Sequence, residues 1–73
     1  MVMKGDQFDV LVKLMRGSPG SAANRAARRV LVDGITQAEA MRETGATRST
    51  VGDAVVRYRD AYQEICDVFN VQK

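Results

Sequence analysis

The stretch that most restricts how this chain can fold is Thr36–Val55, with the sequence TQAEAMRETGATRSTVGDAV. Thr36 followed three positions later by Glu39 is a capping box, which predicts the start of a helix over Gln37–Thr44. Gly45 follows, where a helix-ending residue needs a positive φ that costs glycine no steric strain. The sequence therefore predicts a short helix that ends in a tight glycine turn.

The helix predicted after this turn has two different faces. Thr47 is its candidate N-cap, and Val51, Ala54 and Val55 share one face as inward residues. A helix pair of this kind, over residues 36–57, is typical of a helix-turn-helix unit, whose second helix enters the DNA major groove. The alternative is an ordinary αα-hairpin in a small helical domain. The residues left to project outward are short, polar or basic: Arg48, Ser49, Thr50, Asp53 and Arg57.

Two further helices are predicted before this unit. Asp6 can cap a first helix over Gln7–Arg16. The GSPGS segment then separates it from a second helix over about Ala22–Val32, for which Ser21 or Ser18 is the cap. An Asp-Gly pair ends that second helix. Helical spacing predicts these inward residues for the two helices: Phe8, Leu11, Val12, Met15, Ala23, Ala26, Ala27, Val30 and Leu31.

Neither glycine nor proline occurs after Gly52, so helix is predicted to continue or restart beyond it. Residues 58–70 are assigned to a fifth helix, and the alternative is that this helix is continuous with the one before it. Its apolar residues continue a heptad-like spacing that begins at Val51. We assign the lower part of this seam to a homodimer contact, and the alternative is that it folds back onto the first helix. Cys66 is interpreted as a small buried apolar residue, with a redox role as the alternative. The predicted interface residues are Tyr58, Tyr62, Ile65, Cys66 and Phe69.

These elements predict an all-α protein, a small five-helix helix-turn-helix domain with a C-terminal dimerisation helix. Residues 1–73 are expected to form a single domain. A chain of 73 residues buries only roughly 60% of its unfolded surface, so its core gives a thin margin of stability. With one cysteine and no histidine, the chain can form neither an intrachain disulfide nor a zinc site that would add stability. Small domains without either are usually stabilised by oligomerisation.

Composition also narrows the class of function. The absence of histidine removes the commonest general base, there are no paired carboxylates, and GSPGS lacks the lysine and spacing of a P-loop. An enzyme, a cofactor or a small-molecule ligand is therefore not expected. No apolar run approaches the ~18 residues of a membrane span and no signal sequence precedes a cleavage site, so we expect a cytoplasmic protein without a membrane partner.

Charge is unevenly distributed, although the net charge is only +2. From Arg25 to Arg59 there are seven basic and four acidic residues, a local charge of +3. From Asp60 onward there are three acidic residues and one basic residue, Lys73, which give a local charge of −2. Basic charge on the predicted unit favours contact with duplex phosphates. The alternative is a solvated surface of mixed charge.

The outward residues of the second helix are candidate base-reading groups. Arg48 can donate to guanine O6 and N7. The alternative is plain surface charge, but a cation at a helix N-terminus is unfavourable there, which favours a role in contacting a ligand. Ser49 and Thr50 can bond base edges or phosphates, or can be simple helix-start polarity. Asp53 and Arg57 share the outward face, and a plain i, i+4 salt bridge is the alternative for that pair. Candidates for phosphate contact, which fix register without reading sequence, are Gln37, Thr47, Arg28 and Arg29.

Within Arg28–Val55 the chain resembles the plasmid KorA/TrfB family of transcriptional repressors. The VLVDG run leading into a Gln-Ala helix start, at a fixed distance from the glycine turn, makes the resemblance more specific than a generic helix-turn-helix. The residues that carry it are Arg28, Val30, Leu31, Val32, Asp33, Gly34, Gln37, Ala38, Gly45, Thr47, Arg48, Val51, Ala54, Val55 and Arg57.

The resemblance implies a homodimeric repressor that binds a palindromic operator at promoters of plasmid maintenance or transfer genes. The family reads bases with a glutamine and flanking arginines; the matching arginines are Arg48 and Arg57, but Asp53 occupies the glutamine position. A carboxylate there could accept from cytosine N4 or orient Arg57. Longer members carry a C-terminal dimerisation and partner-binding region, which is not carried over to this chain.

The leading hypothesis is therefore a sequence-specific repressor that binds double-stranded DNA as a homodimer and occludes a promoter. The alternative from another class is a small helical interaction module, an adaptor or antitoxin-like subunit that binds another protein. The two differ in the face between Arg48 and Arg57, where an adaptor would be expected to expose apolar anchors.

Overall fold

Four helices make up the part of the chain that the structure describes. A computed structural model describes residues 3–69 and contains α1 (Gly5–Leu14), α2 (Ala22–Asp33), α3 (Gln37–Thr44) and α4 (Arg48–Phe69), with no strand in this range. The all-α prediction is confirmed, whereas the prediction of five helices is wrong. Within residues 3–69, no helix has the length and apolar character needed to cross a membrane.

The predicted fourth and fifth helices form one uninterrupted helix. α4 runs for 22 residues, and Gly52 costs a helix interior only about 1 kcal/mol relative to alanine. Packing of the buried face on both sides of Gly52 outweighs that cost, so the helix does not break. At 1.5 Å per residue α4 is about 33 Å long, close to the 35 Å longest dimension of the molecule. Asn70, the last residue of the predicted fifth helix, lies outside the described residues.

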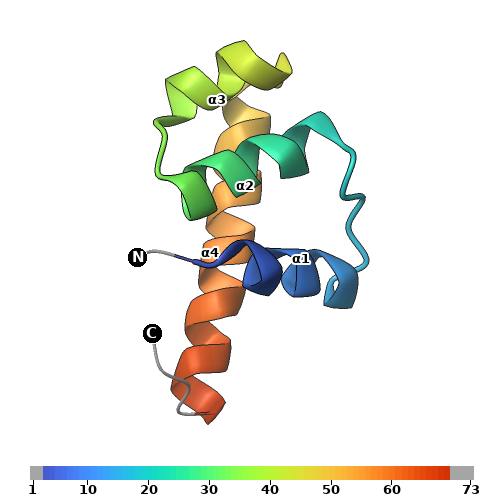
Figure 1. Cartoon of the computed structure of the whole chain (residues 1–73), viewed down its shortest axis with the longest axis vertical. Coiled ribbons are helices and arrows are strands. Elements are labelled where there is room, and N and C mark those ends of the chain that lie inside the picture. Colours follow the sequence, from blue (N-terminus) through green and yellow to red (C-terminus); the bar gives the residue numbers. More distant parts are fainter. Residues whose placement is uncertain (1–2, 70–73) are drawn as a thin grey trace.

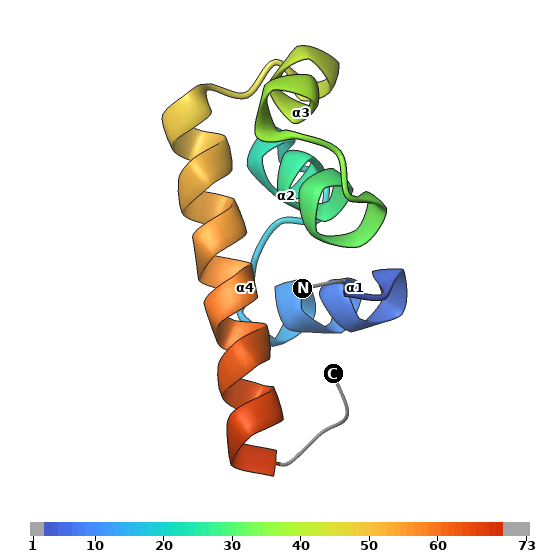
Figure 2. The ribbon, with the colours of Figure 1, turned by 90° about the vertical axis from the view of Figure 1, so that its left-hand side faces the viewer.

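The other three helices are stacked along one side of α4 (Figures 1 and 2). α3 lies beside the first turns of α4, α2 beside its middle and α1 beside its lower half (Figure 2). α2 contacts all three of the other helices. The last turns of α4 extend beyond α1 (Figure 2). The two ends of α4 therefore have different neighbours.

The first helix begins and ends earlier than predicted. The side-chain oxygen of Gln7 accepts a hydrogen bond of 3.0 Å from the backbone N–H of Lys4, so the helix starts at Gly5 and Lys4 is its N-cap. Asp6, the predicted cap, lies in the first turn, where its charge suits the helix dipole. Met15, predicted to be inward, follows the helix and is 37% exposed.

Small side chains allow the helices to approach closely. Ala26 and Ala27 of α2, Ala40 of α3 and Ala54 of α4 are at most 1% exposed, which lets the three backbones lie close together. Ser21 caps α2 as one of the two predicted candidates, with its hydroxyl accepting from the Asn24 N–H at 3.2 Å.

The lower seam of α4 packs on α1. The rings of Phe8 and Tyr58 lie 4.9 Å apart at 55°, a tilted pair worth about 0.5–1.5 kcal/mol beyond the area it buries. Tyr58, Tyr62 and Cys66 are all at most 6% exposed. Desolvation, with a hydrogen bond to Cys66, raises the pKa of Tyr62 above its usual 10.0.

This burial changes how the predicted dimer residues are understood. Tyr58, Tyr62 and Cys66 belong to the core of their own chain, as the alternative of folding back onto the first helix expects. These three side chains are buried in their own chain, so they do not offer surface to a second copy. Ile65 is half-buried and Phe69 is 71% exposed, so only these two of the five side chains offer surface to another molecule.

Candidate nucleic-acid interface

The turn between α3 and α4 is built as its sequence predicts. The Thr36 hydroxyl accepts from the Glu39 N–H at 3.1 Å, and the Glu39 carboxylate accepts from the Thr36 N–H at 3.2 Å. The bond from the Thr36 N–H, and then a bond of 3.0 Å that the Thr36 hydroxyl donates to the same carboxylate, hold the pKa of Glu39 below its usual 4.5. Gly45 ends α3 with φ 76°, and its N–H donates to the Met41 carbonyl at 2.8 Å.

α4 begins at Arg48, three residues after Gly45. The Thr50 N–H donates to the Thr47 hydroxyl at 3.2 Å, so Thr47 acts as the predicted cap. The Thr47 hydroxyl in turn donates to the Thr50 hydroxyl at 2.8 Å. Both threonine side chains remain exposed, so their oxygens stay accessible to an incoming group.

The first half of α4 has one buried and one exposed face. Val51, Ala54 and Val55 are at most 5% exposed and form the buried face. At ~100° per residue, Ser49 and Asp53 lie on the side opposite this face. All five predicted base-reading residues are exposed: Arg48, Ser49, Thr50, Asp53 and Arg57. We call this surface the α4 polar face.

The charged groups of the α4 polar face are not paired with each other. Within residues 3–69, Arg48, Asp53 and Arg57 take part in no ion pair, so the salt bridge proposed as an alternative for Asp53 and Arg57 does not form. The Arg57 guanidinium instead lies 5.8 Å from the centroid of the Tyr58 ring. All three side chains are exposed on the first half of α4, so they are available to a ligand.

The start of α3 lies next to the start of α4. Gln37, Ala38, Met41 and Arg48 line an open depression between the two helices. A Cβ placed on Gly52 would lie 3.7 Å from the side-chain oxygen of Gln37. Gln37 and Arg48 are thus brought to one surface, as expected if one contacts phosphate and the other a base.

Val56 is a residue of this surface that sequence reasoning missed. It is 44% exposed and lies three residues after Asp53 on the outward side of α4. Its spacing of seven from Ser49 would have placed it on this side. An apolar side chain there can contact a thymine methyl group.

Arg28 and Arg29 form ion pairs with acidic residues of the same chain. The Arg28 Nε donates to Asp9 of α1 at 3.1 Å. Arg29 binds Glu43 of α3 through two bonds of 2.7 and 2.9 Å and Asp33 through a third of 2.9 Å. These pairs join α2 to α1 and to α3, and the role of both arginines as phosphate ligands stays a prediction.

The Arg29 link perturbs the ionisation of both partners. Its hydrogen bonds to Glu43 and then Asp33 raise the pKa of Arg29. The same bond from Arg29 lowers the pKa of Glu43 below its usual 4.5. The charged fork holds the C-terminal turn of α3 against α2 and thereby helps to position the turn at Gly45.

Comparison with known proteins agrees with these features. No curated protein and no solved structure matches the chain. The sequence model of one family, KORA, described as TrfB plasmid transcriptional repressor, matches residues 3–70. That span includes α1 and all of α4 as well as the segment in which the resemblance was found. The prediction of the family is confirmed: the chain belongs to the family of TrfB plasmid transcriptional repressors.

Proposed function

We propose that this repressor binds a specific operator in double-stranded DNA through the helix-turn-helix unit of residues 36–57. It binds as a homodimer to a palindromic site that overlaps a promoter, and it represses by blocking access of polymerase. Neither a ligand nor a cofactor is needed for this mechanism, which would operate in the cytoplasm of the host of the plasmid.

The observation that carries the proposal is the α4 polar face. A core helix needs only its apolar face to be buried, yet the exposed residues of the first half of α4 include two arginines, a carboxylate and two hydroxyl groups within ten residues. None of the three charged groups takes part in an ion pair within residues 3–69. These are the groups that read base edges in a major groove. The tight Gly45 turn sets α4 at an angle to α3, which leaves its first turns free to enter that groove.

Each side chain has a distinct proposed role. Arg48 donates to guanine O6 and N7, and Asp53 accepts from cytosine N4. Ser49, Thr50 and Arg57 contact base edges or nearby phosphates. Gln37 and Thr47, at the starts of the two helices, donate to phosphate and fix the register.

A protein-interaction module is the less supported function. The α4 polar face exposes a single apolar side chain, Val56, whereas a docking helix offers several apolar anchors at helical spacing. Among residues 3–69, the other exposed large apolar side chains belong to α1, the residue after it and the last turns of α4.

Selection of bound duplexes from a random DNA pool tests the proposal. We expect one preferred sequence in two inverted copies, with affinity that falls steeply as salt concentration rises. Equal affinity for every duplex, or no binding at low salt, would show that the α4 polar face does not read bases. A single, non-repeated site would retain DNA reading and reject the dimer.

A further inference from the structure

Val56 lies near the centre of the surface that the proposed function turns toward DNA. At ~100° per residue, Ser49, Asp53 and Val56 point within about 40° of the direction opposite the buried face of α4. Arg48 and Arg57 lie on the two flanks of this direction. Single exposed apolar side chains are common on protein surfaces, so what distinguishes Val56 is its position.

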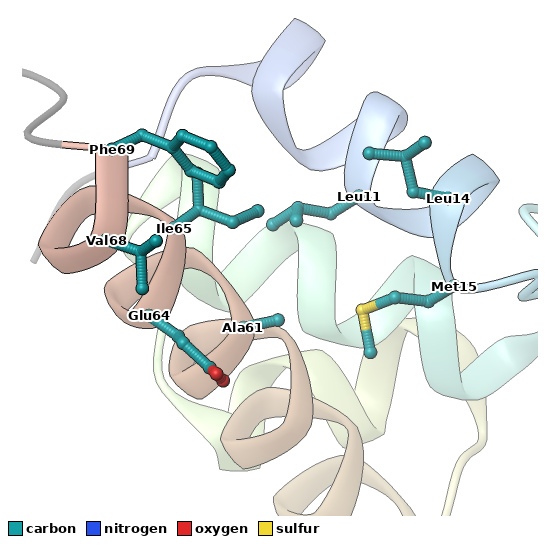
Figure 3. Close-up of a pocket in the computed structure, with 8 residues that line it drawn as sticks. All are labelled: Leu11, Leu14, Met15, Ala61, Glu64, Ile65, Val68 and Phe69. Carbon is teal, nitrogen blue, oxygen red and sulfur yellow. The ribbon is translucent and has the colours of Figure 1, made fainter.

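Val56 is separate from the other exposed apolar side chains. Among residues 3–69, four of these line one groove between α1 and the end of α4: Leu14, Met15, Val68 and Phe69 (Figure 3). Val56 precedes Val68 by twelve residues, which is about 18 Å along α4 at 1.5 Å per residue. Val56 therefore belongs to the α4 polar face and not to that groove.

The neighbours of Val56 on the surface of α4 are polar or lack a side chain. Residues three and four positions apart are adjacent on a helix, and for Val56 these residues are Gly52, Asp53, Arg59 and Asp60. Arg59 pairs with Asp60 at 3.4 Å. Val56 itself is 44% exposed, so its methyl groups remain accessible beside these polar groups.

Gly52 leaves room beside Val56. A helical side chain leans toward the N-terminus of its helix, which directs Val56 over the turn that contains Gly52. Within residues 3–69, and apart from its chain neighbours and the backbone of α4, a Cβ placed on Gly52 would meet only the side-chain oxygen of Gln37, at 3.7 Å. A methyl group of a base can therefore approach Val56 from this side.

The methyl groups of Val56 match one feature of the major groove. Base edges there present hydrogen-bond donors and acceptors, and thymine adds an apolar group, its C5-methyl. Ser49 and Asp53 can bond to donors or acceptors, whereas the side chain of Val56 forms no hydrogen bond. The thymine methyl is therefore the group of an unmodified duplex that Val56 fits.

We propose that Val56 is a specificity-determining residue that contacts the C5-methyl group of one thymine in each half-site. This inference rests on the proposed function and adds to it a residue outside the five predicted base-reading positions. The contact removes methyl surface of both partners from water, and burial of one methyl-sized group favours binding about fourfold. Cytosine, which lacks the methyl group, gains nothing from Val56.

The spacing along α4 predicts where this thymine lies. For a helix that lies along the major groove, the three residues from Asp53 to Val56 rise about 4.5 Å, against ~3.4 Å between successive base pairs. The thymine should therefore lie one or two base pairs from the pair that Asp53 contacts. Arg48 lies about 12 Å before Val56 along the helix, so its guanine should lie about three or four base pairs from the thymine.

Uracil substitution tests the contact, because deoxyuridine lacks the methyl group of thymine and keeps all its hydrogen-bonding groups. The probe is the duplex recovered by selection from the random pool, with each thymine replaced in turn. Affinity of the full chain should fall about fourfold at one thymine in each half-site. Val56→Ala should bind the thymine and uracil duplexes nearly equally, and its melting temperature should change little because Val56 is exposed. A uracil effect that persists unchanged in Val56→Ala overturns the proposal.

Two control variants separate this contact from others. Thr50→Ser removes a methyl group from the α4 polar face and keeps the hydroxyl that accepts from Thr47, so the uracil effect should remain about fourfold. Val10→Ala makes the same change at an exposed valine of α1 and should alter neither affinity nor the uracil effect. Loss of the uracil effect in Thr50→Ser would assign the methyl contact to Thr50 and reject it for Val56.

The role of Val56 and the proposed function can fail separately. A preferred duplex in which uracil is tolerated at every thymine overturns the role of Val56, while sequence-specific binding stands. Equal weakening of Val56→Ala on every duplex would place the valine at the DNA backbone and also overturn its role. No preferred duplex at all would reject the proposed function, and the role of Val56 with it.

Discussion

The two halves of α4 belong to one helix and share one buried face, but they differ in what they expose. The first half, Arg48–Arg57, exposes arginines, hydroxyl groups and one carboxylate. The second half, Asp60–Phe69, exposes acidic groups and large apolar side chains. The first surface carries groups that can contact phosphates and bases, and only Asp53 there would repel a phosphate. The second surface carries acidic groups that would repel DNA, and its apolar side chains could contact a protein.

This difference shows how a short chain can present two chemically different surfaces along one helix. The buried face of α4 is continuous from Val51 to Cys66, so both halves are held by the same core. Only the outward residues change along the helix. A substitution that affects one surface should therefore leave the other intact, and the predictions below test that separation.

The largest expected effect is on operator binding when the second half is altered. Phe69→Asp should lower affinity for a two-site operator by 100-fold or more, because a monomer loses the effective concentration of its second reading helix. Sedimentation and mobility-shift titration measure the two effects together. Val56→Asp is the matched change in the first half and should reduce DNA binding while the protein stays dimeric. If Phe69→Asp leaves operator affinity unchanged, the halves are not coupled in this way.

An intermediate effect is expected when the first half loses its leading arginine. Arg48→Ala should weaken binding to the selected operator about 10- to 100-fold and leave random DNA almost unaffected, because a guanine contact discriminates by roughly 1–3 kcal/mol. Dimerisation and melting temperature should not change. Arg42→Ala, which removes the same charge from α3, serves as the control. An equal loss on all duplexes would make Arg48 a phosphate ligand.

A smaller effect concerns stability. Gly52→Ala should stabilise the chain by about 0.5–1 kcal/mol, since glycine is unfavourable inside a helix and the added Cβ meets only the Gln37 oxygen at an ordinary 3.7 Å. Denaturant unfolding gives the free energy. Gly45→Ala is the contrasting control, expected to destabilise by about 1–2 kcal/mol because its φ is 76°. Destabilisation by Gly52→Ala would show that α4 is strained at this point.

The smallest effect is the contribution of Glu43 to acid sensitivity. Its pKa is lowered by Arg29, so its contribution to the free energy of unfolding is full above pH 4.5 and is lost as pH falls through the lower folded-state pKa. Glu43→Gln should therefore be slightly less stable at neutral pH and lose less stability below pH 4.5. Melting temperatures between pH 7 and pH 3 measure this. Parallel curves for the two proteins would contradict a structural role for the Arg29–Glu43 link.

Features set by local chemistry could be predicted from the sequence. The Thr36 capping box, the positive φ at Gly45 and the Thr47 cap each depend on residues within four positions of one another, and all three are present. The exposure of the candidate residues from Arg48 to Arg57 was expected from the helical spacing of the buried Val51 and Val55. Their exposure could therefore be predicted from the sequence, whereas their roles in reading bases stay predictions.

Features set by packing between distant segments could not be predicted in the same way. Whether α4 breaks after Gly52 depends on the helices stacked against it, and whether Tyr62 faces the core or a partner depends on where α1 lies. The engagement of Arg29 with Glu43 joins residues on two helices. None of these follows from spacing within one segment.

The continuity of α4 has a consequence for the choice of operator. α4 is one continuous helix between Asp53 and Ile65, so the proposed dimer contact and the proposed DNA-contacting turns would form one rigid unit. One base pair inserted between the half-sites displaces the second by about 3.4 Å and rotates it by roughly 35°. A rod cannot absorb that change by bending, so the repressor should tolerate altered bases within the spacer far better than an altered spacer length.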